Sequence, residues 1–231
     1  MPDDKVFLIT GASTGIGAAA ARHAARAGYR LVLGARSEEK LRALAAELGG
    51  EDRALVAPGD VTEWGDQQRT VAAALERFGR LDVVFANAGF GGSRGFLNDD
   101  PDTWRSMVLT NVYGAALTIR ATVEALKRSR GHLLLTGSVA GRRAMPGSLY
   151  SCTKWAVTAM GEALRQDVHG TGVRVTVVEP GAVRTPFWDD PAALTDPLTA
   201  DDVAEAVMFA VSRPPHVDVN EILVRPTVQQ L

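Results

Sequence analysis

Residues 5 to 17 read Lys5-Val-Phe-Leu-Ile-Thr10-Gly-Ala-Ser-Thr-Gly15-Ile-Gly17, and an alanine-rich segment follows them up to Gly28. The apolar run to Thr10 predicts a strand, the glycines predict a tight turn, and the alanine-rich segment predicts a helix. Glycines in such a turn let a pyrophosphate approach the amides at the helix N-terminus, where the helix dipole favours an anion. The spacing G-x-x-x-G-x-G differs from the commoner G-x-G-x-x-G. Its place between a strand and a helix still indicates a dinucleotide-binding unit.

The remainder of the chain alternates between strand and helix patterns. Strands are expected at residues 30–35, 53–57, 81–86, 132–136, 173–178 and 221–224, and helices at 38–48, 63–79, 101–127, 148–169 and 203–211. Such alternation produces a mainly parallel sheet that is covered by helices on both faces. We therefore predict an α/β fold with one doubly wound Rossmann-type domain over residues 1–231 and a sheet of about seven strands. A short substrate loop is expected near residues 187–198.

Length and composition exclude several classes of function. With 231 residues, of which 46% are hydrophobic, the chain can bury the core of one domain. The net charge is -2, and the scattered Lys and Arg residues offer no basic patch to a nucleic acid or an anionic membrane. The start Met-Pro-Asp-Asp lacks a signal-peptide pattern, and no apolar run reaches the ~18 residues of a membrane span. We expect a cytoplasmic protein.

The cysteine and the histidines predict neither a disulfide nor a metal site. Cys152 is the single cysteine and cannot form an internal disulfide, which agrees with a reducing compartment. The four histidines lie far apart without ligand-like spacing, at His23, His132, His169 and His216. No metal is expected.

The second strand pattern ends at Arg36, and no Asp or Glu occurs from Arg30 to Arg36. An NAD site would place an acidic residue here to bind the ribose 2′-hydroxyl, whereas an arginine suits the 2′-phosphate of NADP. A solvated arginine at a helix start is the alternative. At the end of the next strand, Asp60 could bond the adenine amino group or cap the helix that begins near Glu63. The pattern favours NADP(H) as cofactor.

Tyr150 and Lys154 lie one turn apart on one face of the helix expected at 148–169. A tyrosine that carries protons near neutral pH needs its reference pKa of ~10 lowered by roughly 3 units, or about 4 kcal/mol. A lysine ammonium held ~4 Å away supplies that Coulomb energy at an effective dielectric constant near 20, so we expect Lys154 to lower the pKa of Tyr150. Ser138 opens a glycine-rich turn and could face Tyr150 across a cleft. Taken alone, either piece favours the plain interpretation as a helix surface pair or a turn serine, because such residues are common in helices and turns.

Two other strands are expected to end at the same cleft. Asn87-Ala-Gly89 follows the strand at 81–86, and its glycine would let the backbone lie against a cofactor. The strand at 173–178 runs into Glu179-Pro-Gly-Ala-Val-Arg-Thr185. Open α/β sheets bind ligands at such carboxyl ends. Asn111 lies inside a helical pattern, where asparagine is mildly unfavourable, so it has either a functional reason or a backbone partner.

With these residues in place, the chain resembles the short-chain dehydrogenases/reductases over essentially its whole length. The matching motifs, in the family's order, are Thr10-Gly-Ala-Ser-Thr-Gly-Ile-Gly17, Asn87-Ala-Gly89, Asn111, Ser138, Tyr150-x-x-x-Lys154, and Pro180-Gly181 with Thr185. The resemblance implies that Tyr150 is the general acid in ketone reduction and the base in alcohol oxidation. Lys154 would lower its pKa and hold the nicotinamide ribose. Ser138 would polarise the substrate carbonyl, and Asn111 would keep a water in the proton relay.

The resemblance also implies a site for NADP(H). Besides Tyr150 and Lys154, the expected cofactor-binding residues are Gly11, Ser13, Thr14, Gly15, Ile16, Gly17, Arg36, Asp60, Val61, Asn87, Ala88, Gly89, Pro180, Gly181, Val183 and Thr185. The chain departs from the family's pattern in the gap between Ser138 and Tyr150, which is one residue shorter than in many relatives. The segment after Thr185 is also short, from which we expect a more open substrate pocket than usual. Arg36 matches NADP-using members, whereas Thr14 is not the basic residue that some of them carry. Related enzymes pair through the helices expected here at 101–127 and 148–169, which implies a homodimer or homotetramer.

The expected function is hydride transfer between NADP(H) and the carbonyl or alcohol group of a small aldehyde, ketone or hydroxy acid. A non-catalytic dinucleotide-binding regulator is the alternative, because a fold does not fix a function. A regulator need not keep Ser138, Tyr150 and Lys154 together. An epimerase or dehydratase usually needs a larger substrate region than the segment after Thr185. Candidate substrate contacts are Phe90, Arg94, Arg142, Arg143, Met145, Phe187 and Trp188, and either Arg142 or Arg143 could attract a carboxylate.

Overall fold

Seven parallel strands form one sheet in the computed structural model, which describes residues 5–187 and 195–230. The strands are β1 (Val6–Thr10), β2 (Arg30–Ala35), β3 (Ala54–Pro58), β4 (Val83–Ala86), β5 (His132–Thr136), β6 (Arg174–Pro180) and β7 (Glu221–Val224). Their order is β3-β2-β1-β4-β5-β6-β7, and every neighbouring pair is parallel. The strand order reverses between β1 and β4, which opens a crevice at their carboxyl ends. The predicted fold class is confirmed.

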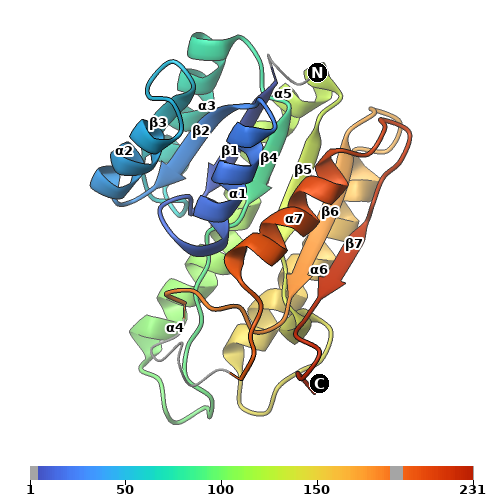
Figure 1. Cartoon of the computed structure of the whole chain (residues 1–231). Coiled ribbons are helices and arrows are strands. Elements are labelled where there is room, and N and C mark those ends of the chain that lie inside the picture. The colour runs from blue at the N-terminus through green and yellow to red at the C-terminus, as the bar shows by residue number, and fades with distance from the viewer. Residues whose placement is uncertain (1–4, 188–194, 231) are drawn as a thin grey trace.

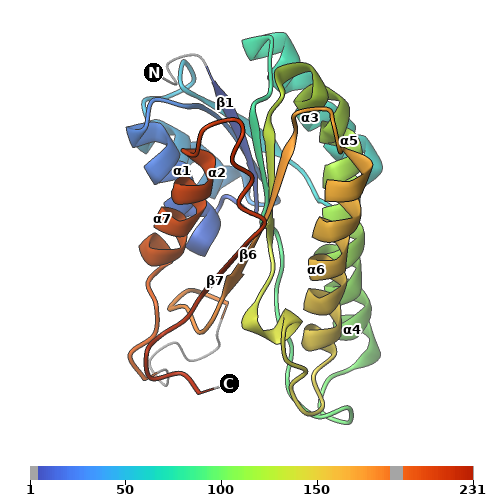
Figure 2. The ribbon, with the colours of Figure 1, turned by 90° about the vertical axis from the view of Figure 1, so that its right-hand side faces the viewer.

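Helices cover both faces of the sheet (Figures 1 and 2). One face carries α1 (Gly15–Arg26), α2 (Glu38–Glu47) and α7 (Ala200–Val211), and the other carries α3 (Trp64–Phe78), α5 (Ala115–Ser129) and α6 (Leu149–Asp167). Alternate side chains of β1 pack on opposite faces of the sheet. Phe7 and Ile9 belong to the buried cluster under α1 and α7, and Val6 and Leu8 to the cluster under α5 and α6. Burial on both faces explains why the strands read as continuous apolar runs.

The termini of the helices follow the signals in the sequence. Thr199 and Asp202 form a capping box at the N-terminus of α7, in which each side chain accepts a hydrogen bond from the backbone N–H of the other residue. α3 ends at Gly79, whose φ of +75° is the left-handed conformation that glycine adopts without strain. These caps fix where the chain enters α7 on one face of the sheet and leaves α3 on the other.

The helix expected at 101–127 is divided into three parts. α4 (Pro101–Val108) leads into a π-helical segment η1 (Leu109–Gly114), and α5 continues from it. Asn111 lies inside η1 and is 2% exposed. A π segment inserts an extra residue into the helical ladder and commonly occurs at functional sites. Here it places the Asn111 side chain against the loop that follows β4.

A bilayer-spanning helix is not found within residues 5–187 and 195–230, since none of the helices there combines the length and the apolar character that a span requires.

Candidate active site

A cavity of about 1130 Å³ runs along the carboxyl ends of the strands. It is lined by every residue predicted to bind the cofactor except Gly17, and the lining includes Ser138, Tyr150 and Lys154. The structure therefore brings together segments that lie far apart in the sequence. The cavity extends from the N-terminus of α1 to the N-terminus of α6.

The turn between β1 and α1 leaves the helix N-terminus open to the cavity. Gly11 and Gly15 have φ values of +65° and +56°, which other residues rarely adopt. Thr14 is the N-cap of α1 but accepts no hydrogen bond through its side chain, and the first turn holds no acidic residue. Gly17 is needed for packing, because a Cβ there would lie 2.3 Å from the carbonyl oxygen of Gly11. No side chain caps the start of α1, so its first N–H groups are available to a phosphate.

The cavity wall near the carboxyl end of β2 is cationic. Arg36 lines the cavity together with Ser37 and Lys40, which belong to the start of α2. Sequence reasoning missed Ser37 and Lys40, although a lysine four residues after Arg36 was a visible signal. Two cations at this wall can bind an anionic group.

Asp60 and Val61 line the same end of the cavity from the loop after β3. The Asp60 carboxylate accepts hydrogen bonds from the backbone N–H and the hydroxyl of Thr62, at 2.9 and 2.8 Å. The N-cap of α3 is Glu63, so the suggestion that Asp60 caps this helix is wrong. Thr62 satisfies the carboxylate within a local turn instead.

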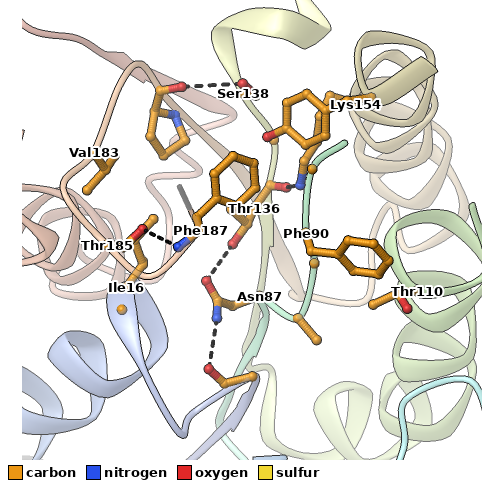
Figure 3. Close-up of a pocket in the computed structure, with 18 of the residues that line it drawn as sticks. Ile16, Asn87, Phe90, Thr110, Thr136, Ser138, Lys154, Val183, Thr185 and Phe187 are labelled. Atoms are coloured by element: carbon orange, nitrogen blue, oxygen red, sulfur yellow. Dashed lines mark hydrogen bonds between the residues drawn. The ribbon is translucent and has the colours of Figure 1, made fainter. Parts of the chain in front are cut away.

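Asn87 ties the end of β4 to both neighbouring strands. Its Nδ2 donates to the Thr10 carbonyl at 3.0 Å. Its Oδ1 accepts from the Thr136 hydroxyl at 3.1 Å, as Figure 3 shows. These bonds fix the backbone of Ala88 and Gly89 along the cavity.

Tyr150 and Lys154 lie in the first turns of α6, which begins at a Ser148 cap that accepts from the Ser151 N–H at 3.1 Å. Lys154 is 4% exposed, and its Nζ donates to the Thr136 carbonyl at 2.7 Å (Figure 3). The same Nζ lies 5.6 Å from the centre of the Tyr150 ring. The predicted helix face is therefore present, and it is turned toward the cavity.

Ser138 stands between α6 and the end of β6. Its Oγ accepts from the Ala140 N–H at 3.1 Å and donates to the Pro180 carbonyl at 3.5 Å (Figure 3). The side chain is 7% exposed. The hydroxyl thus sits in the buried wall from which a substrate carbonyl could be polarised.

The electrostatic environment differs from the one expected. Burial raises the pKa of Tyr150 to about 12, and a hydrogen bond with Ser138 only partly opposes this increase. Burial also lowers the pKa of Lys154 to about 8. The expected lowering of the Tyr150 pKa is therefore wrong for the protein without cofactor, because burial disfavours the charged form of both groups.

Asn111 does not line the cavity but supports one of its walls. Its Nδ2 donates to the Phe90 carbonyl at 2.9 Å, and its Oδ1 accepts from the Phe90 N–H at 3.0 Å. The Nδ2 also donates to the Thr153 hydroxyl on α6 at 3.1 Å. Asn111 therefore joins the loop after β4 to the helix that carries Tyr150. Its role in holding a water stays a prediction.

Five of the predicted substrate contacts line the α6 end of the cavity, and they are Phe90, Arg94, Arg143, Met145 and Phe187. The Phe187 ring packs edge-on against Tyr150 with 5.6 Å between the ring centres. Trp188 lies outside the described residues.

Arg142 does not line the cavity, so its assignment to the substrate pocket is wrong. Its Nε donates to both carboxylate oxygens of Glu179, at 2.7 and 2.8 Å, and its guanidinium also pairs with Glu221. Glu179 is fully buried at the end of β6 and accepts a further bond from the Thr158 hydroxyl at 3.2 Å. A buried carboxylate requires such partners, and this requirement outweighs any role of Arg142 toward a ligand.

The residues from 5 to 193 match the family described as short chain dehydrogenase. An uncharacterised oxidoreductase of Staphylococcus saprophyticus is 36% identical over 228 residues, which cover 96% of this chain and 97% of the relative. An alcohol dehydrogenase from the archaeon Thermococcus sibiricus, complexed with 5-hydroxy-NADP, is 35% identical with a TM-score of 0.91, and 98% of each chain is covered. A 3-ketoacyl-(acyl-carrier-protein) reductase from Brucella melitensis, complexed with NADH, is 28% identical with a TM-score of 0.88, covering 97% of this chain and 98% of that one. With this match and the arrangement of its cavity, the chain belongs to the short chain dehydrogenase family of oxidoreductases.

Proposed function

We propose that this oxidoreductase transfers a hydride between NADP(H) and the carbonyl or alcohol group of a small substrate. One observation carries the proposal. Ser138, Tyr150 and Lys154 line the same cavity as the open N-terminus of α1 and the cationic wall at Arg36. A proton donor, a hydrogen-bond donor and an anion site in one cavity are the parts that nicotinamide-dependent carbonyl reduction requires.

The residues at the α1 end fit a nicotinamide dinucleotide with a 2′-phosphate. The glycine turn and the α1 N-terminus would hold the pyrophosphate. Arg36, Ser37 and Lys40 would hold the 2′-phosphate, and the segment from Pro180 to Thr185 would hold the nicotinamide end. The two solved relatives carry an NADP derivative and NADH, which supports the class of cofactor. The preference for NADP rests on Arg36 and Lys40.

The chemistry of the substrate follows from the groups on α6 and β5. When bound, NADPH supplies a hydride to the carbonyl carbon. Tyr150 gives its phenolic proton to the carbonyl oxygen, while the Ser138 hydroxyl donates a hydrogen bond to that oxygen. With a pKa raised to about 12, Tyr150 is protonated at neutral pH and ready to act as an acid. In the opposite direction, the phenolate accepts the proton of the alcohol.

Lys154 supports this proton transfer electrostatically. With a pKa of about 8 it is mostly protonated at pH 7. Its Nζ lies 5.6 Å from the centre of the Tyr150 ring. Two opposite charges about this far apart attract by about 3 kcal/mol at an effective dielectric constant near 20, so the ammonium stabilises the phenolate that remains after proton donation. Its hydrogen bond to the Thr136 carbonyl keeps it in this position.

Self-association through α4, η1 and α6 is part of the proposal. Large apolar side chains on these elements are exposed, namely Val108, Leu109, Tyr113 and Trp155. Exposed apolar patches of this kind mark interaction surfaces. Light scattering should give the mass of a homodimer or homotetramer, and a monomeric mass at micromolar concentration would contradict this part.

The function is tested by titrating the protein with NADPH and NADH and then measuring oxidation of NADPH with a panel of aldehydes and ketones. Reduction of NADP⁺ with hydroxy acids covers the reverse direction. We expect tighter binding of NADPH than of NADH, with turnover on at least one panel compound. Tight binding without turnover on a broad panel would favour the dinucleotide-binding regulator. A preference for NADH would contradict the role given to Arg36.

A further inference from the structure

The segment after β7 folds back over the end of β6 and reaches the cavity. The Gly181 N–H donates to the Val224 carbonyl at 2.7 Å, which holds the two strand ends together. Pro226 is buried, and the chain then turns through a bond from the Gln229 N–H to the Pro226 carbonyl at 3.1 Å. Gln229 and Gln230 line the cavity beside Gly181 and Ala182. Figure 2 shows this tail at the lower edge of the sheet, where the carboxyl ends of the strands lie.

The side chain of Gln229 makes a specific contact with this cavity wall. Its Oε1 accepts a hydrogen bond from the Ala182 N–H at 2.8 Å. The Ala182 carbonyl in turn accepts from the Leu198 N–H at 3.0 Å. The Ala182 residue is therefore held from two directions by parts of the chain that are remote from it in sequence.

The close approach of the tail also explains why residue 181 is a glycine. A Cβ at Gly181 would lie 2.2 Å from the Gln229 Oε1 and 2.7 Å from the Arg225 Cβ. Any larger residue at this position would displace the tail. Gly181 is thus required by the tail as well as by any ligand that lies against it.

The contact lies next to the reacting groups. Pro180 directly precedes Gly181, and its carbonyl accepts from the Ser138 hydroxyl at 3.5 Å (Figure 3). The segment that Gln229 holds therefore follows directly after the residue to which Ser138 is hydrogen-bonded. It is also the segment to which the proposed function assigns the nicotinamide end of the cofactor.

We propose that Gln229 is a positioning residue, whose side-chain oxygen fixes the backbone from Gly181 to Val183 for the nicotinamide end of the cofactor. The expected change in cofactor binding rests on the proposed function, whereas the fixing of the backbone by Gln229 does not. Without the acceptor, the Ala182 N–H loses its partner and the segment is no longer held in one conformation. The loss of one such bond weakens binding by about tenfold.

Three variants separate this role from general effects on the tail. Gln229→Met keeps the length of the side chain but removes the amide acceptor. Gln229→Glu keeps an acceptor oxygen. Val228→Ala is the matched control, because Val228 is 52% exposed and does not line the cavity.

The first measurement is the Kd for NADPH and for adenosine 2′,5′-bisphosphate, which occupies only the end of the site near Arg36. Gln229→Met should weaken NADPH binding about tenfold and leave the bisphosphate unchanged. Gln229→Glu should restore most of the affinity, and Val228→Ala should bind as wild type. Wild-type NADPH affinity of Gln229→Met, or equal weakening of both ligands, would overturn the proposal.

The second measurement is hydrogen exchange of the Ala182 amide in the protein without ligand. Gln229→Met should exchange this amide at least about tenfold faster than wild type and than Val228→Ala. An unchanged exchange rate would overturn the proposal whatever the cofactor is. If wild type binds neither NADPH nor NADH, the proposed function fails, and the exchange rate still decides whether Gln229 positions this segment.

Discussion

The two ends of the cavity are built in different ways. The end near α1 consists of consecutive pieces of chain, because β1, the glycine turn, α1 and β2 follow one another, and Arg36 comes directly after them. The end near α6 is assembled from the turn after β5, the start of α6, the end of β6 and the C-terminal tail. Side chains hold these remote pieces together through the contacts of Arg142 with Glu179 and of Gln229 with Ala182.

This difference predicts different responses to mutation. Local backbone geometry forms the first end, so substitutions there should change cofactor affinity and leave the fold intact. Clamps between remote segments form the second end, so substitutions there should change stability, the rate of the chemical step or, at Gln229, the binding of the nicotinamide end of the cofactor.

Arg142→Met should destabilise the protein by about 3–5 kcal/mol, because the buried Glu179 carboxylate would lose its main partner. Urea unfolding measures this loss. Arg42→Met is the matched control, since Arg42 pairs with Glu38 on an exposed helix face with side chains 62% and 50% exposed. That pair should contribute less than about 1 kcal/mol. Equal losses for the two variants would show that the α6 end does not depend on this clamp.

Lys154→Met should lower the rate of carbonyl reduction by about 100-fold, which corresponds to the Coulomb energy between the ammonium and the phenolate. It should also raise the apparent pKa of alcohol oxidation, because the ammonium favours the phenolate that acts as base. Steady-state rates across pH measure both effects. Lys127→Met, on the outer part of α5, should react as wild type. A wild-type pH profile for Lys154→Met would exclude the electrostatic role.

Arg36→Ala should raise the Kd for NADPH by about tenfold or more, through loss of a charge-assisted bond to the 2′-phosphate. NADH lacks this phosphate, so its affinity is the internal control and should stay the same. Fluorescence titration gives both constants. If the two cofactors weaken equally, Arg36 shapes the wall without binding the phosphate, and the two ends of the cavity are less distinct than described.

The end near α1 was predictable from the sequence, and much of the end near α6 was not. Apolar runs that stop at glycines predict the strands, and the motifs at Gly11, Asn87 and Tyr150 follow in a fixed order along the chain. The π segment depends on the contact between Asn111 and Phe90, which no local pattern encodes. The prediction for Arg142 was wrong because its partner, the buried Glu179 carboxylate, is remote in sequence and comes next to it only in the folded chain. No local pattern predicts the positioning role of Gln229, because its partner Ala182 follows a different strand.

The amino ends of the strands lie away from the cavity, so a substitution there should change the stability of the protein and leave the cavity as it is. His132 begins β5, is 1% exposed, and shares a hydrogen bond of 2.7 Å with Thr176. Burial lowers its pKa from 6.5 to about 3, so the folded protein holds it neutral while the unfolded chain takes up a proton below pH 6.5. The stability that the protein gains from a neutral His132 is fully present above pH 6.5. It is lost as the pH falls toward 3, because protonation then favours the unfolded chain. Between pH 7 and pH 5 the loss should be about 2 kcal/mol.

His132→Gln removes the titrating group and should flatten this part of the pH dependence of stability. Urea midpoints at pH 7 and pH 5 measure it. The Kd for NADPH at pH 7 should match that of wild type, because His132 does not line the cavity. An unchanged pH dependence would mean that other groups dominate the acid response.

The most direct test of the account is a single-turnover measurement of NADPH oxidation by wild type and Tyr150→Phe with a carbonyl compound that wild type reduces. Tyr150→Phe removes the proton donor but keeps the ring that packs against Phe187. We predict equal NADPH affinity for both proteins and a rate at least about 1000-fold lower in the variant. NADPH oxidation at the same rate in both proteins would contradict the assignment of Tyr150 as the acid, and with it the chemical role of the α6 end.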